Sequence, residues 1–294
     1  MEKRDWIILQ TVYEEKNITK AAERLFIAQP TLMYRLQQIE KEFNIKILNR
    51  GRRGVEFTQQ GEYLVTYAKD MLRQLKIMEE NLWNIGDHIH GTIRLCVSRA
   101  FALYKLPHIV KQFTDIHPFA QFSIKTALNL EVIKEVYKQD AHIGFVRGEH
   151  HWSNEKKMIS QETMCIISKE EIEFHQLQRQ NRITYNTDPA LNMVIDNWWN
   201  QHFNKPSNVL VHTDNMEVAK KLVMKGIGYA IVPSTVLEDC DSLHTIVLKD
   251  KEGNPLMWRT WMLYLKDNLN LSMVNEFVNQ VERFSNINNF YKTI

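Results

Sequence analysis

Residues 18–43, ITKAAERLFIAQPTLMYRLQQIEKEF, decide how the N-terminal part of this chain folds. Four apolar residues in this stretch follow one another at intervals of four, three and four positions: Leu32, Leu36, Ile39 and Phe43. This spacing predicts a helix from about Gln29 to Phe43 with a single buried stripe. Pro30 falls in its first turn, where the missing N–H removes no helical hydrogen bond. A shorter helix is expected just before it, so the segment predicts two helices joined by a tight turn.

The opposite face of the second predicted helix is polar and aromatic. It carries Pro30, Thr31, Tyr34, Gln37, Gln38 and Lys41. Side chains of these kinds on an exposed helix suit the major groove of a duplex. Residues 16–53 contain nine Lys/Arg against three Glu, a local excess of +6 in a chain whose net charge is only +2. Such a basic segment in a near-neutral chain is expected of a small module that binds phosphates.

A basic, glycine-flanked segment follows at residues 49–54, NRGRRG, and residues 55–57 then alternate like a short strand. This arrangement predicts a wing whose arginines contact phosphates. The arginines are Arg50, Arg52 and Arg53.

Three segments carry a family resemblance: ITKAAERL at 18–25, AQPTL at 28–32 and FTQQG at 57–61. Together they resemble the winged helix-turn-helix of LysR-type transcriptional regulators, over about the first sixty residues of the chain. The resemblance implies that Gln29, Pro30, Thr31 and Tyr34 approach base edges. It also puts Arg35 in the DNA-binding set. Ala28 and Met33 stand where the family commonly has serines, and Tyr34-Arg35 also departs from its pattern, so the operator sequence is left open.

A long helix is predicted from about Gln59 to Ile85, with Thr58 as its N-cap. Seven of its apolar residues recur at heptad spacing: Leu64, Ala68, Met71, Leu75, Met78, Leu82 and Ile85. So narrow a seam favours pairing with a partner helix, and the resemblance implies that it joins two subunits. Packing on its own domain is the alternative. Residues 86–91 are expected to form a hinge, and the isolated pair His88 and His90 predicts no metal site. No cofactor is expected.

From Thr92 onward, strands alternate with helices. A βαβαβ order is predicted over residues 92–146, and a second set begins with a strand at Ile183, so the fold class is α/β behind a helix-rich N-terminus. The resemblance implies two α/β subdomains of periplasmic-binding-protein-like fold. The expected organisation is a DNA-binding domain at 1–58, a linker helix at 59–86 and an effector-binding domain at 87–294. Subdomain I would span 92–165 and 266–294, and subdomain II 166–265.

Effector-binding residues are expected beyond the carboxyl ends of the strands, near helix N-termini that favour anions. The candidates are Ser98, Arg99, Asn129, Arg147, Thr213 and Arg259. The hypothesis is that Ser98, Arg147 and Arg259 bind a carboxylate-bearing metabolite, with a di- or tricarboxylate as one form. The alternative is that both arginines pair with local Asp or Glu, and that Ser98 only caps a helix.

Other classes of protein are disfavoured. The sequence has no nucleotide-binding loop, serine-hydrolase elbow or zinc-protease motif, so no enzyme is expected. Three widely spaced cysteines, no signal peptide and no apolar run long enough for a membrane span predict a cytoplasmic protein without a membrane partner. The expected partners are double-stranded promoter DNA, an anionic small-molecule effector and further copies of the chain, as a homodimer or homotetramer. Two alternatives remain: a DNA-binding regulator with a ligand-free oligomerisation domain, and a small-molecule binding protein.

Overall fold

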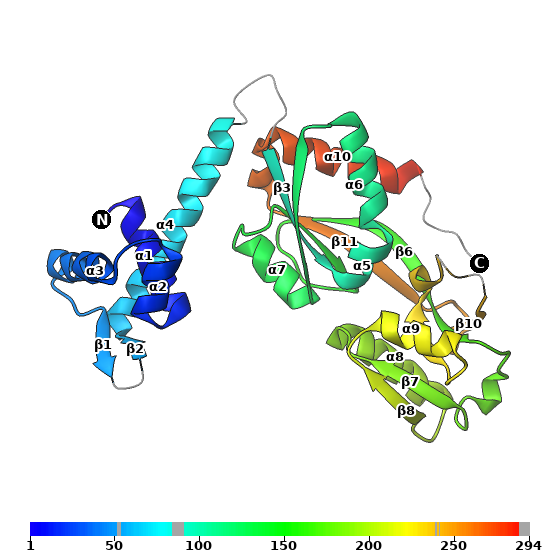
Figure 1. The fold of residues 1–294 in the computed structure, drawn as a ribbon. Coiled ribbons are helices and arrows are strands. Elements are labelled where there is room, and N and C mark those ends of the chain that lie inside the picture. Colours follow the sequence, from blue (N-terminus) through cyan, green and yellow to red (C-terminus); the bar gives the residue numbers. More distant parts are fainter. Residues whose placement is uncertain (52–53, 84–90, 239, 241, 288–294) are drawn as a thin grey trace. The chain divides into compact units, whose positions relative to one another are not determined.

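The structure, a computed structural model, describes residues 1–51, 54–83, 91–238, 240 and 242–287 (Figure 1). The chain divides into two compact units, Met1–Ile85 and Gly86–Ile294. Each unit buries a hydrophobic core of its own. None of the helices in the described ranges has the length and apolarity that crossing a bilayer requires.

The N-terminal unit is helical, with one small hairpin. Its elements are α1 (Lys3–Glu15), α2 (Ile18–Arg24), α3 (Gln29–Phe43), β1 (Leu48–Gly51), β2 (Gly54–Phe57) and α4 (Gln59–Trp83). The side chain of Asn17 caps α2 by accepting a hydrogen bond from the Lys20 backbone N–H at 3.1 Å. The hydroxyl of Thr58 accepts one from the Gly61 N–H at 3.0 Å, so it caps α4 as predicted.

The predicted stripe of α3 is buried along three of its four positions. Leu32, Leu36 and Ile39 are at most 2% exposed and pack with residues of α1, α2 and α4. Phe43 was predicted to be buried and is 47% exposed. The physical reason is that residues 41–44 all lie in the exposed last turn, which Asn44 ends in a left-handed conformation with φ of 52°.

The Gly86–Ile294 unit has two lobes. Lobe I contains β3 (Gly91–Ser98), α5 (Arg99–Tyr104), α6 (Leu106–Ile116), β4 (Ala120–Ala127), α7 (Asn129–Tyr137), β5 (Ile143–Arg147), η3 (Lys266–Asn270) and α10 (Ser272–Ile287). Lobe II contains η1 (Phe174–Gln176), β7 (Asn181–Tyr185), α8 (Pro189–His202), β8 (Asn208–Thr213), α9 (Met216–Met224), β9 (Ala230–Pro233), η2 (Ser234–Leu237) and β10 (His244–Val247). Two strands, β6 (Glu155–Ser168) and β11 (Met257–Tyr264), run through both lobes.

A seven-stranded sheet joins the lobes in the order β10-β6-β11-β5-β3-β4, with β9 also paired to β6. In lobe I, β3 is parallel to β4 and β5, and β11 is antiparallel to β5 and β6. In lobe II, β7 and β8 form a separate parallel pair. The predicted alternation of strands and helices therefore builds parallel strands in each lobe, as expected.

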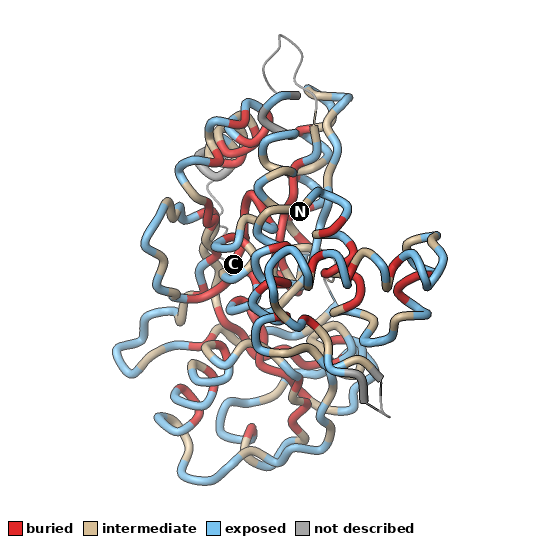
Figure 2. Tube along the Cα trace, turned by 90° about the vertical axis from the view of Figure 1, so that its left-hand side faces the viewer, coloured by how far each residue is buried: buried red, intermediate tan, exposed pale blue. Residues whose placement is uncertain are grey.

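Helices cover both faces of the lobe I strands. On one face, residues of α6 and α10 such as Phe113 and Phe277 pack against Leu95 and Phe145 of the sheet. On the other face, α7 packs on Cys96 and its neighbours. Figure 2 shows the result: buried residues run continuously along central strands, whereas the covering helices alternate buried and exposed positions. Lobe II has its own core around Trp198, Trp199 and Tyr229.

Strand β6 was missed by the sequence analysis, which predicted no strand between Val146 and Ile183. Seven of its first nine residues are polar and six of the nine are half-exposed, and only Met164–Ser168 are continuously buried. Strict alternation, which is the usual signal of a half-buried strand, is therefore absent. The strand is long because it pairs with β11 over Glu155–Thr163 and with β9 and β10 after that.

The second crossing between the lobes lies inside β11 and not at residue 265, where the sequence analysis put it. Trp258 packs in the lobe II core, and Met262 and Tyr264 pack in the lobe I core. The pairing of β11 with β6 shifts register between Thr260 and Trp261, at the point where the strand passes from one core to the other.

Candidate nucleic-acid interface and ligand cleft

The polar face of α3 is open to solvent. Gln29, Pro30 and Thr31 are exposed, and Tyr34 is 59% exposed, on the side of the helix opposite the buried leucines. The Thr19 hydroxyl donates a hydrogen bond to the Gln29 side-chain oxygen at 3.3 Å, which links α2 to the start of α3. A rigid helix thus presents polar and aromatic side chains of the kinds that read base edges.

Arg35 does not belong to this open face, which corrects the prediction. Its Nη2 and Nε donate to Oδ1 of Asp5 at 2.5 and 3.0 Å, and the Asp5 side chain is only 3% exposed. The hydrogen bond to the Asp5 carboxylate raises the pKa of Arg35, which keeps the guanidinium charged. Leaving Asp5 for a phosphate or a base would uncover a buried carboxylate, so Arg35 ties α3 to α1.

The predicted wing is an antiparallel hairpin. Strands β1 and β2 pair with Arg50 opposite Val55 and Gly51 opposite Gly54. The Val55 N–H donates to the Lys16 carbonyl at 3.4 Å and so attaches the hairpin to the end of α1. Arg52 and Arg53 lie outside the described residues, and for Arg50 only the backbone is described.

The seven residues of the predicted dimerisation seam have different surroundings. Leu64 and Ala68 are at most 8% exposed and belong to the core of their own unit, so they are not on an open seam. Met71 and Leu75 are half-buried, while Met78 is 44% and Leu82 61% exposed. Ile85 lies outside the described residues, as do His88 and His90. Of the seam residues that the structure describes, those that their own unit leaves uncovered therefore lie in the second half of α4.

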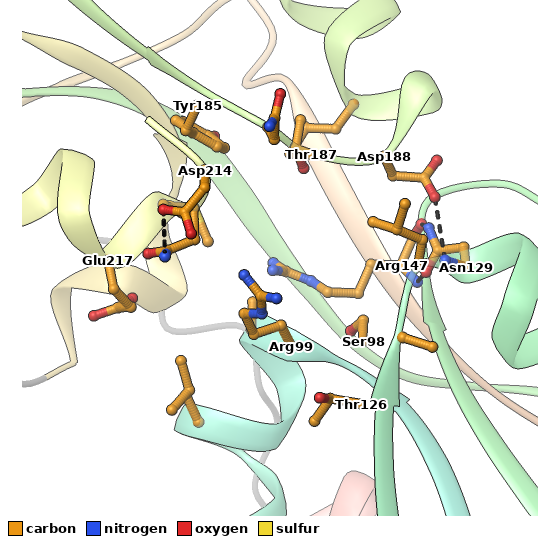
Figure 3. A pocket seen from close by; sticks show the side chains of 18 of the residues that line it. Ser98, Arg99, Thr126, Asn129, Arg147, Tyr185, Thr187, Asp188, Asp214 and Glu217 are labelled. Atoms are coloured by element: carbon orange, nitrogen blue, oxygen red, sulfur yellow. Dashed lines mark hydrogen bonds between the residues drawn. The ribbon is translucent and has the colours of Figure 1, made fainter. Parts of the chain in front are cut away.

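A cavity of about 600 Å³ opens in the two-lobed unit at the carboxyl ends of β3, β4, β5, β7 and β8 (Figure 3). Parallel strands gather ligand-binding side chains at this edge. Its polar lining comes from Ser98, Arg99, Thr126, Asn129, Arg147, Tyr185, Asn186, Thr187, Asp188, Asp214, Asn215 and Glu217. Four of the six predicted effector residues line it, namely Ser98, Arg99, Asn129 and Arg147.

The Arg147 side chain already has an ion-pair partner within the protein. Its guanidinium forms an ion pair with Glu162 of β6, with side chains 8% and 13% exposed. The other Glu162 oxygen accepts from the Thr235 N–H at 2.8 Å. Asn129 accepts from the Arg147 N–H at 3.1 Å and donates to its carbonyl at 2.7 Å, so its amide is used as well. Arg147 and Asn129 thus shape the cavity wall.

Arg99 and Ser98 lie where β3 passes into α5, and both differ from Arg147. Arg99 is exposed and makes no hydrogen bond or ion pair within the described part of the chain. The Ser98 hydroxyl is buried and likewise has no hydrogen-bond partner there. An unpaired cation beside an unsatisfied hydroxyl, both facing a cavity, can bind a carboxylate without breaking any existing contact.

Thr213 and Arg259 do not line the cavity, which corrects two further predictions. The Thr213 hydroxyl donates to the Asn215 carbonyl at 2.8 Å, inside the β8–α9 turn. Arg259 is exposed on β11, where it donates to Glu149 at 3.1 Å and to Gln161 at 3.2 Å. The local ion pair that the sequence analysis left open as an alternative is therefore what the structure has at both Arg147 and Arg259.

Asp188, Glu217 and Tyr185 are among the lining residues that the sequence analysis did not name. Asp188 caps α8 and Glu217 lies in the first turn of α9, next to the cavity. Tyr185 ends β7 and donates its hydroxyl to the Ile231 carbonyl at 2.9 Å; burial raises the pKa of Tyr185 and keeps it protonated. The dipeptide Asp188-Pro189 was a usable signal, because an N-cap before a first-turn proline marks a helix start near a strand end. In the described ranges, no group of three or more His, Cys, Asp or Glu side chains is placed to hold a metal.

A winged helix-turn-helix unit, followed in sequence by a two-lobed α/β unit with a ligand-sized cavity, defines the class of effector-responsive DNA-binding regulators. The family model of the LysR substrate binding domain matches residues 86–285, and that of the bacterial regulatory helix-turn-helix protein, lysR family, matches residues 4–62. The chain belongs to the LysR family of transcriptional regulators. The resemblance and the fold class predicted from the sequence are confirmed, and the family is one of regulators and not of enzymes.

Relatives of similar length support this assignment. The chain is 35% identical over 278 residues to the uncharacterized HTH-type transcriptional regulator YraN of Bacillus subtilis (strain 168), covering 95% of this chain and 96% of that protein. It is 31% identical over 284 residues to YkuM of the same organism, covering 96% and 97%. Full-length CbnR, solved in complex with its target DNA, shares the fold with a TM-score of 0.73 at 18% identity, covering 97% of this chain and 100% of CbnR.

Proposed function

We propose that this regulator binds double-stranded operator DNA through the exposed face of α3 and the β1–β2 wing, and that a small-molecule carboxylate modulates this binding. Residues 1–58 would be the DNA-binding domain, 59–86 the linker and 87–294 the effector-binding domain. The observation that carries the proposal is the two-sidedness of α3. Leu32, Leu36 and Ile39 of its apolar stripe are buried in the core of the unit, whereas Thr31 and Tyr34 are exposed to solvent on the other side.

Gln29, Pro30, Thr31 and Tyr34 would approach base edges, and Arg50, Arg52 and Arg53 would contact phosphates. Two copies of the chain would pair through the uncovered second half of α4, around Leu75, Met78 and Leu82. A twofold dimer of this kind would place two α3 helices in successive major grooves of an imperfect palindrome. Further contacts between effector domains would make a homotetramer. The complex would act in the cytoplasm.

In the cavity, Arg99 and Ser98 would take the carboxylate of the effector. Support comes from their lack of partners in the described residues and from their position at the carboxyl end of β3. The ligand acts as an effector only if it binds two arrangements of the protein unequally. A cavity that draws side chains from both lobes meets this condition, because its lining changes when the lobes move.

The DNA contacts are tested with duplexes selected from a random-sequence pool by the full-length protein. Arg52→Ala should weaken binding to all duplexes alike and lower the slope of log affinity against log salt by about 1. Tyr34→Ala should instead change the sequence preference, by about 1–3 kcal/mol at the affected base pair. Arg179→Ala removes the same charge from an exposed site in lobe II and is the control. Unaltered nonspecific binding by Arg52→Ala would show that the wing assignment is wrong.

The effector site is tested by thermal unfolding of the full-length protein with a panel of organic acids. We expect at least one acid to raise the melting temperature of the wild type, and Arg99→Gln to abolish the effect. Arg259→Gln removes an arginine outside the cavity and should keep the effect. A response to no acid at all would favour the alternative of a ligand-free oligomerisation domain.

A further inference from the structure

The charged side chains of the cavity determine which kind of molecule it can hold. The lining has two cations and three carboxylates: Arg99, Arg147, Asp188, Asp214 and Glu217. Arg147 is neutralised by Glu162 of β6, close behind the lining. A ligand that carries only negative charge would therefore meet more carboxylates than free cations. Because an unpaired charge in a partly desolvated site is costly, the ligand's charges should match those that the protein leaves free.

Two of the three carboxylates are bonded to residues of other elements. Asp188 accepts from the Ala190 N–H at 3.1 Å, as the cap of α8, and from the Asn129 N–H of lobe I at 3.3 Å. Glu217 accepts the hydroxyl hydrogen of Tyr104. Both contacts hold helix ends in position, so neither group is free for a ligand.

Asp214 and Arg99 remain. Asp214 is exposed in the turn between β8 and α9, and the only hydrogen bond its carboxylate accepts in the described structure comes from the adjacent Asn215 amide, at 2.9 Å. Arg99 belongs to lobe I and Asp214 to lobe II, and no ion pair joins them. Figure 3 shows the Arg99 guanidinium directed toward the side of the cavity that Asp214 and Glu217 form. Within the described residues, the cavity thus offers a cation without a partner on one lobe and, on the other, a carboxylate bonded only to its neighbouring residue.

We propose that the effector is a zwitterion, with its carboxylate held by Arg99 and Ser98 and an ammonium group held by Asp214. The proposal rests on the effector cleft put forward above, and names its ligand class. A zwitterion adds no net charge to the cavity and pairs each of its charges with a group that has no competing ion pair. Because the two groups lie on different lobes, such a ligand bridges the lobes and favours the arrangement that brings them together.

The test uses calorimetric titration of full-length protein with matched pairs of probes. One member carries a carboxylate and an ammonium, and in the other a hydrogen or a hydroxyl replaces the ammonium. The pairs are β-alanine with propionate, γ-aminobutyrate with butyrate, δ-aminovalerate with valerate, and each standard amino acid with its α-hydroxy acid. The first three pairs vary the separation of the two charges. Succinate and citrate represent the di- and tricarboxylates.

We expect at least one amine-bearing probe to bind about tenfold or more tightly than its partner, because only the ammonium can make a charge-assisted contact with Asp214. Asp214→Asn should remove this preference while the carboxylate partner binds as before. Arg99→Gln should weaken both members of the pair. Asp267→Asn changes an exposed carboxylate outside the cavity and should behave as the wild type. Thermal unfolding of Asp214→Asn checks that the variant is folded.

Two outcomes overturn the proposal in different ways. Arg99-dependent binding of succinate, citrate or the deaminated acids, without preference for an amine or with a preference that survives Asp214→Asn, refutes the zwitterion and leaves the carboxylate cleft standing. Absence of Arg99-dependent binding for every probe refutes the cleft itself, and the zwitterion with it.

Discussion

Helix α3 and the cavity of the two-lobed unit draw their exposed side chains from the chain in opposite ways. On α3, the exposed residues proposed to read bases lie between Gln29 and Tyr34. A single buried stripe on the opposite side of the same helix fixes the position of all of them. The cavity takes its lining from the ends of five strands, between Ser98 and Trp258. A local surface depends on the core directly beneath it. A distributed cavity depends on ion pairs and caps that connect distant segments, so the two sites should respond to different kinds of mutation.

The largest effect is expected at the Arg147–Glu162 pair. Arg147→Met leaves the Glu162 carboxylate largely buried without its partner, which should destabilise the two-lobed unit by about 3–5 kcal/mol. Urea unfolding followed by tryptophan fluorescence measures this, because five of the seven tryptophans lie in that unit: Trp152, Trp198, Trp199, Trp258 and Trp261.

Two controls separate this effect from loss of the ligand site. The double variant Arg147→Met/Glu162→Gln should recover most of the stability, because no buried charge is left unpaired. Arg99→Met should change stability by no more than about 0.5 kcal/mol, since Arg99 is exposed and unpaired in the described structure. If Arg99→Met and Arg147→Met lowered the free energy of unfolding equally, the distinction between an arginine without an ion pair and one with a buried partner would be contradicted.

The next effect is expected in the N-terminal core. Leu36→Ala should destabilise that unit by about 2–5 kcal/mol, because Leu36 is only 2% exposed and the cavity it leaves cannot fully close. DNA affinity should fall with it, while the melting-temperature response to an effector should not change. Circular dichroism during urea unfolding checks the first part, and Gln37→Ala on the exposed face is the control. Loss of the effector response in Leu36→Ala would show that the two units do not behave independently.

A smaller effect is expected on α4. If its second half pairs two chains, Leu82→Ala should raise the dimer dissociation constant about tenfold, which corresponds to about 1.4 kcal/mol. Sedimentation equilibrium measures this constant. Tyr63→Ala, on an exposed position of the first half of α4 that is 76% exposed, should leave it unchanged. An identical dissociation constant for Leu82→Ala and the wild type would move the dimer interface elsewhere.

The smallest effect concerns thiol reactivity, which reports on the two-lobed unit alone because all three cysteines lie in it. Burial raises the pKa of Cys96 to about 11 and that of Cys165 to about 12, so neither forms much thiolate at mildly alkaline pH. Ellman's reagent should therefore label only Cys240 in the native protein. Leu36→Ala should not change this pattern, and Arg147→Met should speed the labelling of Cys165. Rapid native labelling of Cys96 would contradict the packing of α7 on β3.

The two sites also differed in how far the sequence could predict them. On α3, helical periodicity separated buried from exposed positions correctly for Leu32, Leu36, Ile39, Thr31 and Tyr34. It failed at Phe43, because periodicity does not say where the covering helices end. In the cavity, the rule about strand ends found Ser98, Arg99, Asn129 and Arg147, but it could not tell a free arginine from a paired one.

The ion-pair partners of the arginines were decided by contacts between strands that the sequence analysis did not connect. The partner of Arg147 lies on β6, which was not predicted, and the partner of Arg259 is Glu149, just beyond β5. The division between the lobes was likewise set by pairing, since β6 and β11 each run through both. Such long-range pairings depend on the register of the whole sheet, which local patterns do not encode.

By itself, the sequence determined the family, the order of helices and strands apart from β6, and the exposed face of α3, because these follow from motifs and from residue spacing within single elements. Only the tertiary structure decided which charged groups of the cavity are free. Within the described residues, it left Arg99 and Asp214 without ion pairs and bound Arg35, Arg147 and Arg259 to carboxylates that lie far away in the sequence or on other elements. The physical reason is that an ion pair depends on distance in space, and the fold alone sets that distance for residues on different strands and helices.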